Sequence, residues 1–284
     1  MLSNFFKVAI RNIIRQKSYV LINTAGLAIG IASSIVIILF VVNELSYDRF
    51  NEKYKQIHRL YLDGKIGESE IKSAWTAAPT AKALVYEIPE VTDAVRMQNG
   101  NEAIIKIGKK SYIETHFMLA DSGFFNIFSI PLIQGDPETA LAAPHTLVLT
   151  QSAASKYFGN EDPIGKQIRV NSDSTYFSIT GIMQDVPENA HFEFNVLASM
   201  STRKRSNDEF WLSNNYITYL LLQEDASYKD VEKKIKPILE KNIGPQLQQV
   251  LGISLEEWKS AGNRYGLFLQ PLEDIHLNPE IQHD

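Results

Sequence analysis

The stretch Ser18-Tyr-Val-Leu-Ile-Asn-Thr-Ala-Gly-Leu-Ala-Ile-Gly-Ile-Ala-Ser-Ser-Ile-Val-Ile-Ile-Leu-Phe-Val-Val-Asn43 runs for 26 residues without one charged side chain. A helix needs about 20 apolar residues to cross a bilayer, so residues 18–43 predict a transmembrane helix. Small residues within the stretch also suit a signal-peptide cleavage site. However, the apolar run continues past them, beyond the roughly 7–15 residues of a signal-peptide core. We therefore favour a retained anchor.

The residues before this span are basic. Lys7, Arg11, Arg15 and Lys17 are the only charged residues among the first 43, and basic residues beside a span stay in the cytoplasm. The sequence thus predicts an inside N-terminus and an outside C-terminal part. The other 241 residues hold 24 of the 28 basic side chains and all 33 acidic ones, a net charge of −9. That charge excludes nucleic acid as an expected partner.

Two further patterns belong to the N-terminal region. Apolar residues recur there at helical spacing, with basic residues on another face, which predicts an amphipathic cytoplasmic segment over residues 1–17 that contacts membrane lipid. The alternative is a basic flank without a helix. Within the span, Gly26 and Gly30 have the GxxxG spacing typical of close helix packing. Small residues are also common in membrane helices generally, and the two interpretations are about equally favoured. The apolar positions of the first pattern are Leu2, Phe5, Phe6, Ala9, Ile10, Ile13 and Ile14.

The rest of the chain alternates strand and helix patterns, which predicts an α+β domain. Strands over 56–62 and 91–98 flank a helix over 79–87. Strands over 216–223 and 264–270 flank a helix that Ser227 can cap and that Pro237 should bend. Two such units, far apart in sequence, can share one sheet in a ferredoxin-like layer.

Between these units lies a different pattern, which we interpret as an inserted lobe. A short strand over 146–150 leads into a helix over 151–158, which Thr150 can cap and Gly159 can end. A turn at 162–165 and a hairpin over 167–183 follow. These patterns predict three parts of the outer domain, residues 44–100, 101–213 and 214–284.

Catalytic motifs are weak throughout. The chain has no cysteine. Gly159-Asn-Glu-Asp-Pro-Ile-Gly165-Lys-Gln167 resembles a phosphate-binding loop, but it has one residue too many between the glycines and no Ser or Thr after the Lys. Asp185, Glu188, His191 and Glu193 could hold a metal only if their loop folded around it, and we favour a solvated loop. The aromatic stretch 124–130 is interpreted as core. We expect no catalytic, cofactor-binding or metal-binding residues.

Taken in order, a series of short stretches resembles the N-terminal part of an ABC-transporter permease of the MacB/FtsX type, its first transmembrane helix plus its periplasmic core domain. Each stretch is weak alone, but together they span nearly the whole chain. They include Phe6-Lys-Val-Ala-Ile-Arg-Asn-Ile-Ile-Arg15, Asn23-Thr-Ala-Gly-Leu-Ala-Ile-Gly30, Ser46-Tyr-Asp-Arg-Phe-Asn51, Val95-Arg96, Gly123-Phe-Phe-Asn-Ile-Phe-Ser-Ile-Pro-Leu132, Asp162-Pro-Ile-Gly-Lys166, Thr180-Gly181, Asp185-Val-Pro187 and Ile275-His-Leu277.

The resemblance implies a two-lobed periplasmic domain, a porter-like βαβ lobe with an inserted second α/β lobe, attached to a bacterial inner membrane. It implies a lever mechanism, in which a cytoplasmic ABC ATPase subunit hydrolyses ATP and the span moves the outer domain. A permease dimer and a periplasmic membrane-fusion or adaptor protein are further implied partners. The family has three more spans after the domain, so we expect this chain to be a piece of a longer permease. The implied hinge to the outer domain comprises Ser46, Tyr47, Asp48, Arg49, Phe50 and Asn51.

Two other classes of protein share an N-terminal anchor and an outer α/β domain. The first is the extracytoplasmic sensor domain of a membrane-anchored signalling receptor, which needs one further span and a cytoplasmic output module. The second is an anchored periplasmic enzyme, which the absence of a catalytic motif disfavours.

Overall fold

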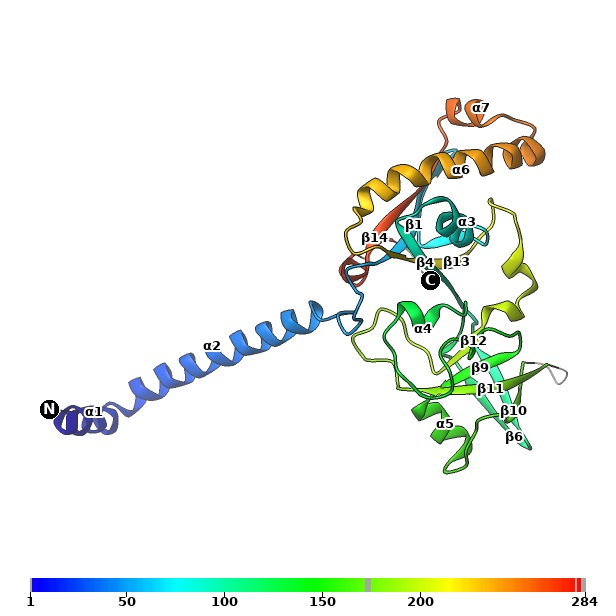
Figure 1. The fold of residues 1–284 in the computed structure, drawn as a ribbon. Coiled ribbons are helices and arrows are strands. Elements are labelled where there is room, and N and C mark those ends of the chain that lie inside the picture. Colours follow the sequence, from blue (N-terminus) through cyan, green and yellow to red (C-terminus); the bar gives the residue numbers. More distant parts are fainter. Residues whose placement is uncertain (1, 172–174, 279, 282–284) are drawn as a thin grey trace. The chain divides into compact units, whose positions relative to one another are not determined.

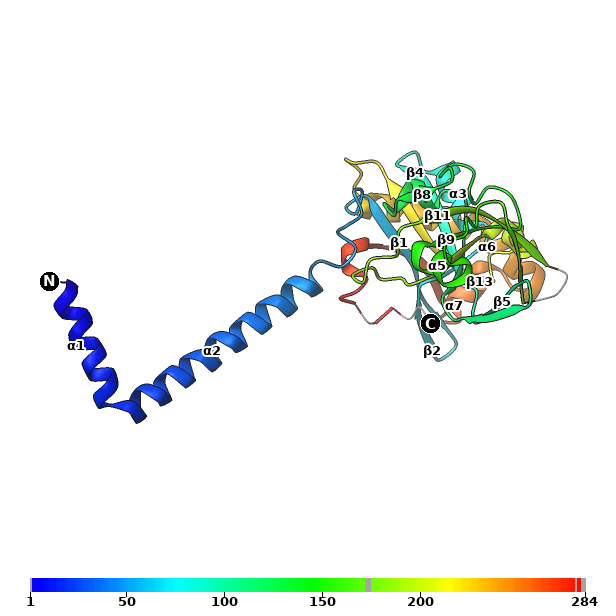
Figure 2. The same cartoon turned by 90° about the horizontal axis from the view of Figure 1, so that it is seen from below.

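The computed structural model describes residues 2–171, 175–278 and 280–281 (Figures 1 and 2). The chain divides into two compact units, Met1–Ser46 and Tyr47–Asp284. The loop predicted between the strands of the 167–183 hairpin lies largely outside the described residues, since 172–174 are not among them.

The first unit consists of two helices, α1 (Leu2–Arg15) and α2 (Lys17–Glu44). An 18-residue window of α2 has a mean hydropathy of 2.7. At 1.5 Å per residue its 28 residues extend for about 42 Å, enough to cross the roughly 30 Å hydrocarbon core. The predicted span is therefore a continuous helix. The segment before it is also helical, and Phe6, Ile10, Ile13 and Ile14 are exposed on it.

In the second unit, the two predicted strand–helix–strand units lie in one layer. The first comprises β1 (Ile57–Ile66), α3 (Thr80–Glu87) and β4 (Val91–Asn99). The second comprises β13 (Asn214–Leu222), α6 (Tyr228–Leu251) and β14 (Arg264–Pro271). The strand order is β14-β1-β13-β4, with antiparallel neighbours. The interleaving confirms the ferredoxin-like layer predicted from the sequence.

Each face of this layer is covered by a different core. On one face, α3 and α6 bury an aliphatic cluster that includes Leu84, Leu220 and Ile235 (Figure 1). On the other face, Phe124 and other buried phenylalanines pack against Tyr219. Because alternate residues of a strand point to opposite faces, β13 contributes Leu220 to one core and Tyr219 to the other. The aromatic stretch 124–130 is thus core, as predicted.

Strands from the segment between β4 and β13 extend the sheet on the far side of β4. The order from β4 is β7 (Phe117–Ala120), β12 (Val196–Ser199), β9 (Thr146–Thr150), β11 (Tyr176–Met183), β10 (Gln167–Val170), β5 (Ala103–Ile107) and β6 (Lys110–Glu114). Three short strands pair off this path: β2 (Ser69–Ser73), β3 (Trp75–Ala77) and β8 (Leu132–Gln134). A third core underlies the far strands and packs on α5 (Gln151–Phe158). The remaining short helices are α4 (Phe124–Ile127), η1 (Met200–Thr202), η2 (Lys204–Asn207), α7 (Leu255–Ser260) and η3 (Leu272–Asp274).

The predicted ends of α5 are confirmed, whereas the predicted cap of α6 is not found. The Thr150 hydroxyl accepts a hydrogen bond from the Ala153 backbone N–H at 3.2 Å, and Gly159 ends α5 at a φ of +63°. A left-handed φ of this kind suits glycine. Ser227 stands at the N-cap of α6 but makes no side-chain cap, which corrects the capping expectation. Its hydroxyl bonds to the Asp230 carboxylate instead. The helix continues through Pro237 and Pro245 to Leu251.

Candidate functional site

The segment that begins the outer unit, Tyr47–Asn51, is fixed by side-chain contacts at almost every position. We call these five residues the junction segment, because α2 ends shortly before them. They form turns rather than helix or strand. Two of them, Asp48 and Asn51, are buried polar residues. Buried polar groups in turns need partners, and the partners here come from distant parts of the chain.

Asp48 is the centre of the junction segment. It is fully buried and has a φ of +59°, a conformation that Asp tolerates better than most residues. Its backbone N–H donates to the Asn189 carbonyl at 2.8 Å. Its carboxylate Oδ1 accepts from the His191 backbone N–H at 3.2 Å and lies 2.7 Å from His191 Nδ1. Both backbone and side chain thus hold the junction segment to the loop around His191.

His191 also bonds a residue of the sheet, so it connects the junction segment with β13. Because a carboxylate only accepts, Nδ1 of His191 carries the proton, and Nε2 then accepts from the Tyr219 hydroxyl at 2.7 Å. Tyr219 lies on β13, opposite Arg59 of β1 in the register of the two strands. Arg59 also donates from Nη2 to Gln270 Oε1 on β14 at 2.7 Å. A buried polar chain, from Asp48 through His191, Tyr219 and Arg59 to Gln270, therefore crosses the layer.

Burial governs the protonation of this chain. It raises the pKa of the Tyr219 hydroxyl, against the opposing effect of Arg59, and it lowers the pKa of the Arg59 guanidinium. Asp48 Oδ2 and Arg59 Nε are both buried and lack a hydrogen-bond partner. Asp48 and Arg59 are therefore connected through His191 and Tyr219 rather than by direct contact. Such a chain has few alternative arrangements, since each break leaves a buried polar group unsatisfied.

The other residues of the junction segment are also anchored. The Tyr47 ring stacks on His276 with 3.3 Å between centroids and an interplanar angle of 3°. Arg49 Nη2 lies 3.2 Å from Glu273 Oε2. Phe50 packs against the phenylalanine core. The ring stack and the ion pair therefore join the junction segment to residues 273–276, near the end of the described chain.

Asn51 closes the segment. Its Nδ2 donates to the Asp48 carbonyl at 3.0 Å, and its Oδ1 accepts from the Ser129 backbone N–H at 2.9 Å. The Ser129 hydroxyl in turn accepts from the Glu52 backbone N–H at 2.9 Å. This exchange ties the turn to the end of the aromatic stretch.

The predicted functional residues fall in different places. The boundary between the two units lies after Ser46, so it divides the six expected hinge residues. The basic residues Lys7, Arg11, Arg15 and Lys17 are all exposed. Gly26 and Gly30 are exposed on α2, and a Cβ added at either one would meet no described atom within 4 Å. Close packing at these glycines therefore requires another helix.

Two features were missed or misread from the sequence. Asp185, Glu188 and Glu193 are exposed, as expected of a solvated loop, but the His191 side chain is only 4 % exposed, so the expectation is wrong for this residue. The flanking Phe192 and Phe194 were a signal for burial, because they face the phenylalanine core. Among the residues that the structure describes, no group of three or more His, Asp or Glu side chains is placed to hold a metal.

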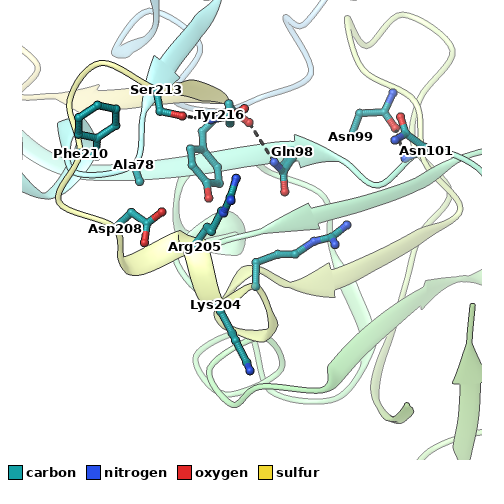
Figure 3. A pocket seen from close by; sticks show the side chains of 12 residues that line it. Ala78, Gln98, Asn99, Asn101, Lys204, Arg205, Asp208, Phe210, Ser213 and Tyr216 are labelled. Atoms are coloured by element: carbon teal, nitrogen blue, oxygen red, sulfur yellow. Dashed lines mark hydrogen bonds between the residues drawn. The ribbon is translucent and has the colours of Figure 1, made fainter. Parts of the chain in front are cut away.

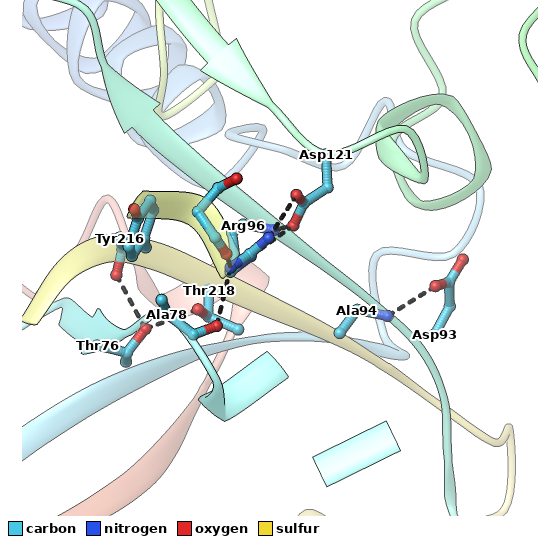
Figure 4. Close-up of polar contacts among 9 residues, drawn as sticks. Thr76, Ala78, Asp93, Ala94, Arg96, Asp121, Tyr216 and Thr218 are labelled. Carbon is cyan, nitrogen blue, oxygen red and sulfur yellow. Dashed lines mark hydrogen bonds and ion pairs between the residues drawn. The ribbon is translucent and has the colours of Figure 1, made fainter. Parts of the chain in front are cut away.

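The second missed feature is Arg96 on β4 (Figure 4). Its Nε and Nη2 contact the two carboxylate oxygens of Asp121 at 2.8 and 2.9 Å. Its Nη1 donates to the carbonyls of Ala78 and Ser206, at 2.8 and 2.6 Å. The planar guanidinium suits this use, because it presents several donors in fixed directions. Arg96 thereby fixes the segment around η2 to the sheet.

Comparison with known proteins agrees with this architecture. A family model described as the MacB-like periplasmic core domain matches residues 20–238. No curated protein matches the chain. A domain of a protein described as a permease, from Porphyromonas gingivalis, has 22% identity and a TM-score of 0.67, covering 78% of this chain and 91% of that one.

Two further solved structures share the fold. The periplasmic region of MacB from Actinobacillus actinomycetemcomitans has 16% identity and a TM-score of 0.51, covering 81% of this chain and 94% of that one. The extracellular domain of the noncanonic ABC-type transporter YknZ from Gram-positive bacteria has 12% identity and a TM-score of 0.51, covering 75% and 99%. The family match spans most of α2 and most of the outer unit. The chain therefore belongs to the family of MacB-like periplasmic core domains of ABC transporter permeases, here with an N-terminal apolar helix.

Proposed function

We propose that this chain transmits movement, driven by a cytoplasmic ABC ATPase subunit, from the span α2 to a periplasmic domain. Export or extrusion of a substrate would follow from the movement of that domain. ATP hydrolysis belongs to the ATPase subunit. A permease dimer, membrane lipid and a periplasmic membrane-fusion or adaptor protein complete the proposed assembly.

The observation that carries the proposal is the fixed junction segment. A displacement applied at Tyr47 moves the outer domain as one body only if the junction segment is held rigidly to that domain. Asp48 is tied to His191 and through it to β13, while Tyr47 and Arg49 are tied to residues near the end of the described chain. Movement of the backbone at Tyr47 would therefore carry the sheet with it. In this proposal the backbone bends only just before Tyr47. The hinge that the family resemblance implies is therefore limited to Ser46 and its N-terminal neighbours.

The division of the outer domain into lobes is part of the proposal. Residues 44–100 and 214–284 would form the porter-like lobe, and residues 101–213 the inserted lobe. The adjacency of β14, β1, β13 and β4 supports the first grouping. The hydrogen bonds between β4 and β7 mean that the two lobes would share one sheet and move together.

The proposed location is the bacterial inner membrane, with one span in this chain and the outer domain in the periplasm. The four basic residues before the span and the absence of acidic ones support this orientation. The family match favours a permease over a sensor of the receptor type, because it concerns a periplasmic core domain of transporters.

A distance measurement tests the lever. Residues 1–284 contain no cysteine, so Lys236→Cys on the exposed face of α6 gives a single spin-label site in each protomer once any cysteine elsewhere in the permease and its ATPase is replaced. In the complete permease with its ATPase in nanodiscs, we expect ATP to change the distance between the two labels. Tyr47→Ala, which removes the stack on His276, should reduce that change while ATP hydrolysis continues.

Tyr86→Ala is the matched control, since Tyr86 is 89% exposed on α3. It should leave the ATP-dependent change intact. An unaltered distance change in the Tyr47→Ala protein would contradict the proposal that the junction segment transmits movement.

A further inference from the structure

A pocket in the outer domain has no place in the proposed lever. Its volume is about 370 Å³. It is lined by the end of β4 and the residues after it, by η2, and by the start of β13 (Figure 3). Most of the lining side chains are cations, carboxamides or aromatic rings, and Ala78, Asp208 and Ser213 complete it. Ligand sites are typically concave and combine a few polar groups with apolar walls.

The walls of the pocket are held in place. Arg96 binds the Ser206 carbonyl and so fixes the backbone of η2 beside the pocket. The same guanidinium lies over the Tyr216 ring, with 5.3 Å to the centroid. Tyr216 is 3% exposed and forms part of the lining. The positions of the lining backbone therefore depend on a bidentate ion pair and a buried ring rather than on a loose surface loop.

The pocket lining has a net positive charge, whereas the outer domain as a whole is net negative. Arg203, Lys204 and Arg205 are consecutive exposed cations, and Asp208 is the carboxylate among the lining residues. In the described part of the chain no ion pair engages any of the three cations. Burial raises the pKa of the Tyr216 hydroxyl; the charge of Asp208 adds to this effect and that of Arg203 opposes it. Lys204 points away from Tyr216 (Figure 3). The outer domain is net acidic, so this local excess of cations favours an anion here over the rest of its surface.

The carboxamides supply donors and acceptors beside the cations. Gln98 Nε2 donates to the Asn215 carbonyl at 3.1 Å, and Asn215 Nδ2 donates to Ser213 Oγ at 2.7 Å. Asn99 Oδ1 accepts from the Asn101 backbone N–H at 2.9 Å. These bonds orient the amides, and within the described residues no hydrogen bond engages Gln98 Oε1, Asn215 Oδ1 or Asn99 Nδ2, so a ligand could use them. Such a mixed set pairs with hydroxyl groups, which both donate and accept.

An aromatic wall completes the set. Phe210 is 40% exposed and lies in the lining with Ala78. An exposed ring beside hydrogen-bonding amides fits the face of a sugar, whose C–H groups are apolar and whose hydroxyls lie at the edge. The guanidinium groups fit a carboxylate better than a neutral group, because they can donate two parallel bonds.

We propose that this pocket binds a small acidic sugar, with its carboxylate at Arg203 and Arg205, its hydroxyls at the carboxamides and its ring near Phe210. The inference is independent of the lever, since no residue of the junction segment lines the pocket. The same chemistry could come from a free uronic acid or from the end of an acidic polysaccharide.

Titration calorimetry on the full chain in detergent tests the proposal. Glucuronic acid should bind, whereas neutral glucose should bind at least tenfold more weakly, and raised salt should weaken the glucuronate affinity. Arg203→Gln/Arg205→Gln should lower the glucuronate affinity at least tenfold with an unchanged melting temperature. Lys229→Gln/Lys236→Gln on α6 removes two exposed cations elsewhere and should leave the affinity unchanged. Stronger binding of a glucuronate-ended oligosaccharide than of glucuronic acid would assign the polysaccharide source.

Three results would overturn the proposal. The first is no glucuronate binding at millimolar concentration. The second is equal binding of glucuronate by the wild type and the Arg203→Gln/Arg205→Gln variant. The third is binding of a short peptide through its C-terminal carboxylate in preference to glucuronate, which would make the ligand a peptide.

Discussion

His191 Nδ1 lies 2.7 Å from Asp48 Oδ1, although the two residues are 143 positions apart in the sequence. This contact joins the first turn of the outer domain to a loop that runs over the phenylalanine core. His191 then bonds Tyr219 on β13. One imidazole thus connects the beginning of the domain with the middle of its sheet.

Asp48→Asn should destabilise the outer domain Tyr47–Asp284 by about 1–3 kcal/mol, because it weakens the bond to a buried His191 while preserving a residue that tolerates a positive φ. Urea unfolding, followed by tryptophan fluorescence, measures the change. Asp225→Asn, at an exposed turn, is the matched control and should unfold like the wild type. Equal stability of the Asp48→Asn and wild-type domains would mean that the buried chain adds nothing to the fold.

How much of this arrangement the sequence could predict depends on the range of the interactions. The order of the βαβ units followed from local patterns, and so did the Thr150 cap and the glycine stop at Gly159. These features depend on residues close together in sequence. The partners of Asp48 and Arg96 did not follow, because hydrophobic periodicity does not specify which distant polar groups meet. The Ser227 cap failed for a local reason, because its hydroxyl interacts with the Asp230 carboxylate three residues on and makes no bond to the helix backbone.

The pH dependence of stability should depend on Glu114, which is buried at the end of β6. Burial alone would raise the pKa of its carboxyl, but hydrogen bonds from Tyr157 and Asn195 outweigh this effect and lower the pKa. A lowered folded-state pKa stabilises the protein above the unfolded pKa, about 4.3. That stability is lost as the pH falls through the folded-state value.

Glu114→Gln should therefore be less stable than the wild type at pH 7, and the difference should shrink as the pH falls below about 4.3. Urea midpoints measured at several pH values give the curve. Glu102→Gln, at an exposed position, serves as the control and should follow the wild type. A constant difference at all pH values would show that the carboxylate charge of Glu114 is not the source of its contribution.

The proposed orientation predicts the location of the C-terminal end. A reporter enzyme that is active only in the periplasm, fused after Asp284, should be active in cells. Reversing the charge of the basic flank at Lys7, Arg11, Arg15 and Lys17 should reduce that activity, since these residues hold the N-terminus inside. Activity of a cytoplasm-dependent reporter at the same position would reverse the assigned topology.

The helix-packing role of Gly26 and Gly30 is tested by substitution in the complete permease. Gly26→Leu/Gly30→Leu should still insert, because Leu is favourable in lipid. No described atom lies near either glycine within this chain, so the added side chains would meet only a neighbouring helix. They should push that helix away and impair coupled transport while expression holds. Ala28→Leu/Ala32→Leu has the same spacing on the opposite face of α2 and should be tolerated. Full transport by the glycine double variant would remove the packing role from this face and leave only the apolar length of α2 as the requirement for anchoring.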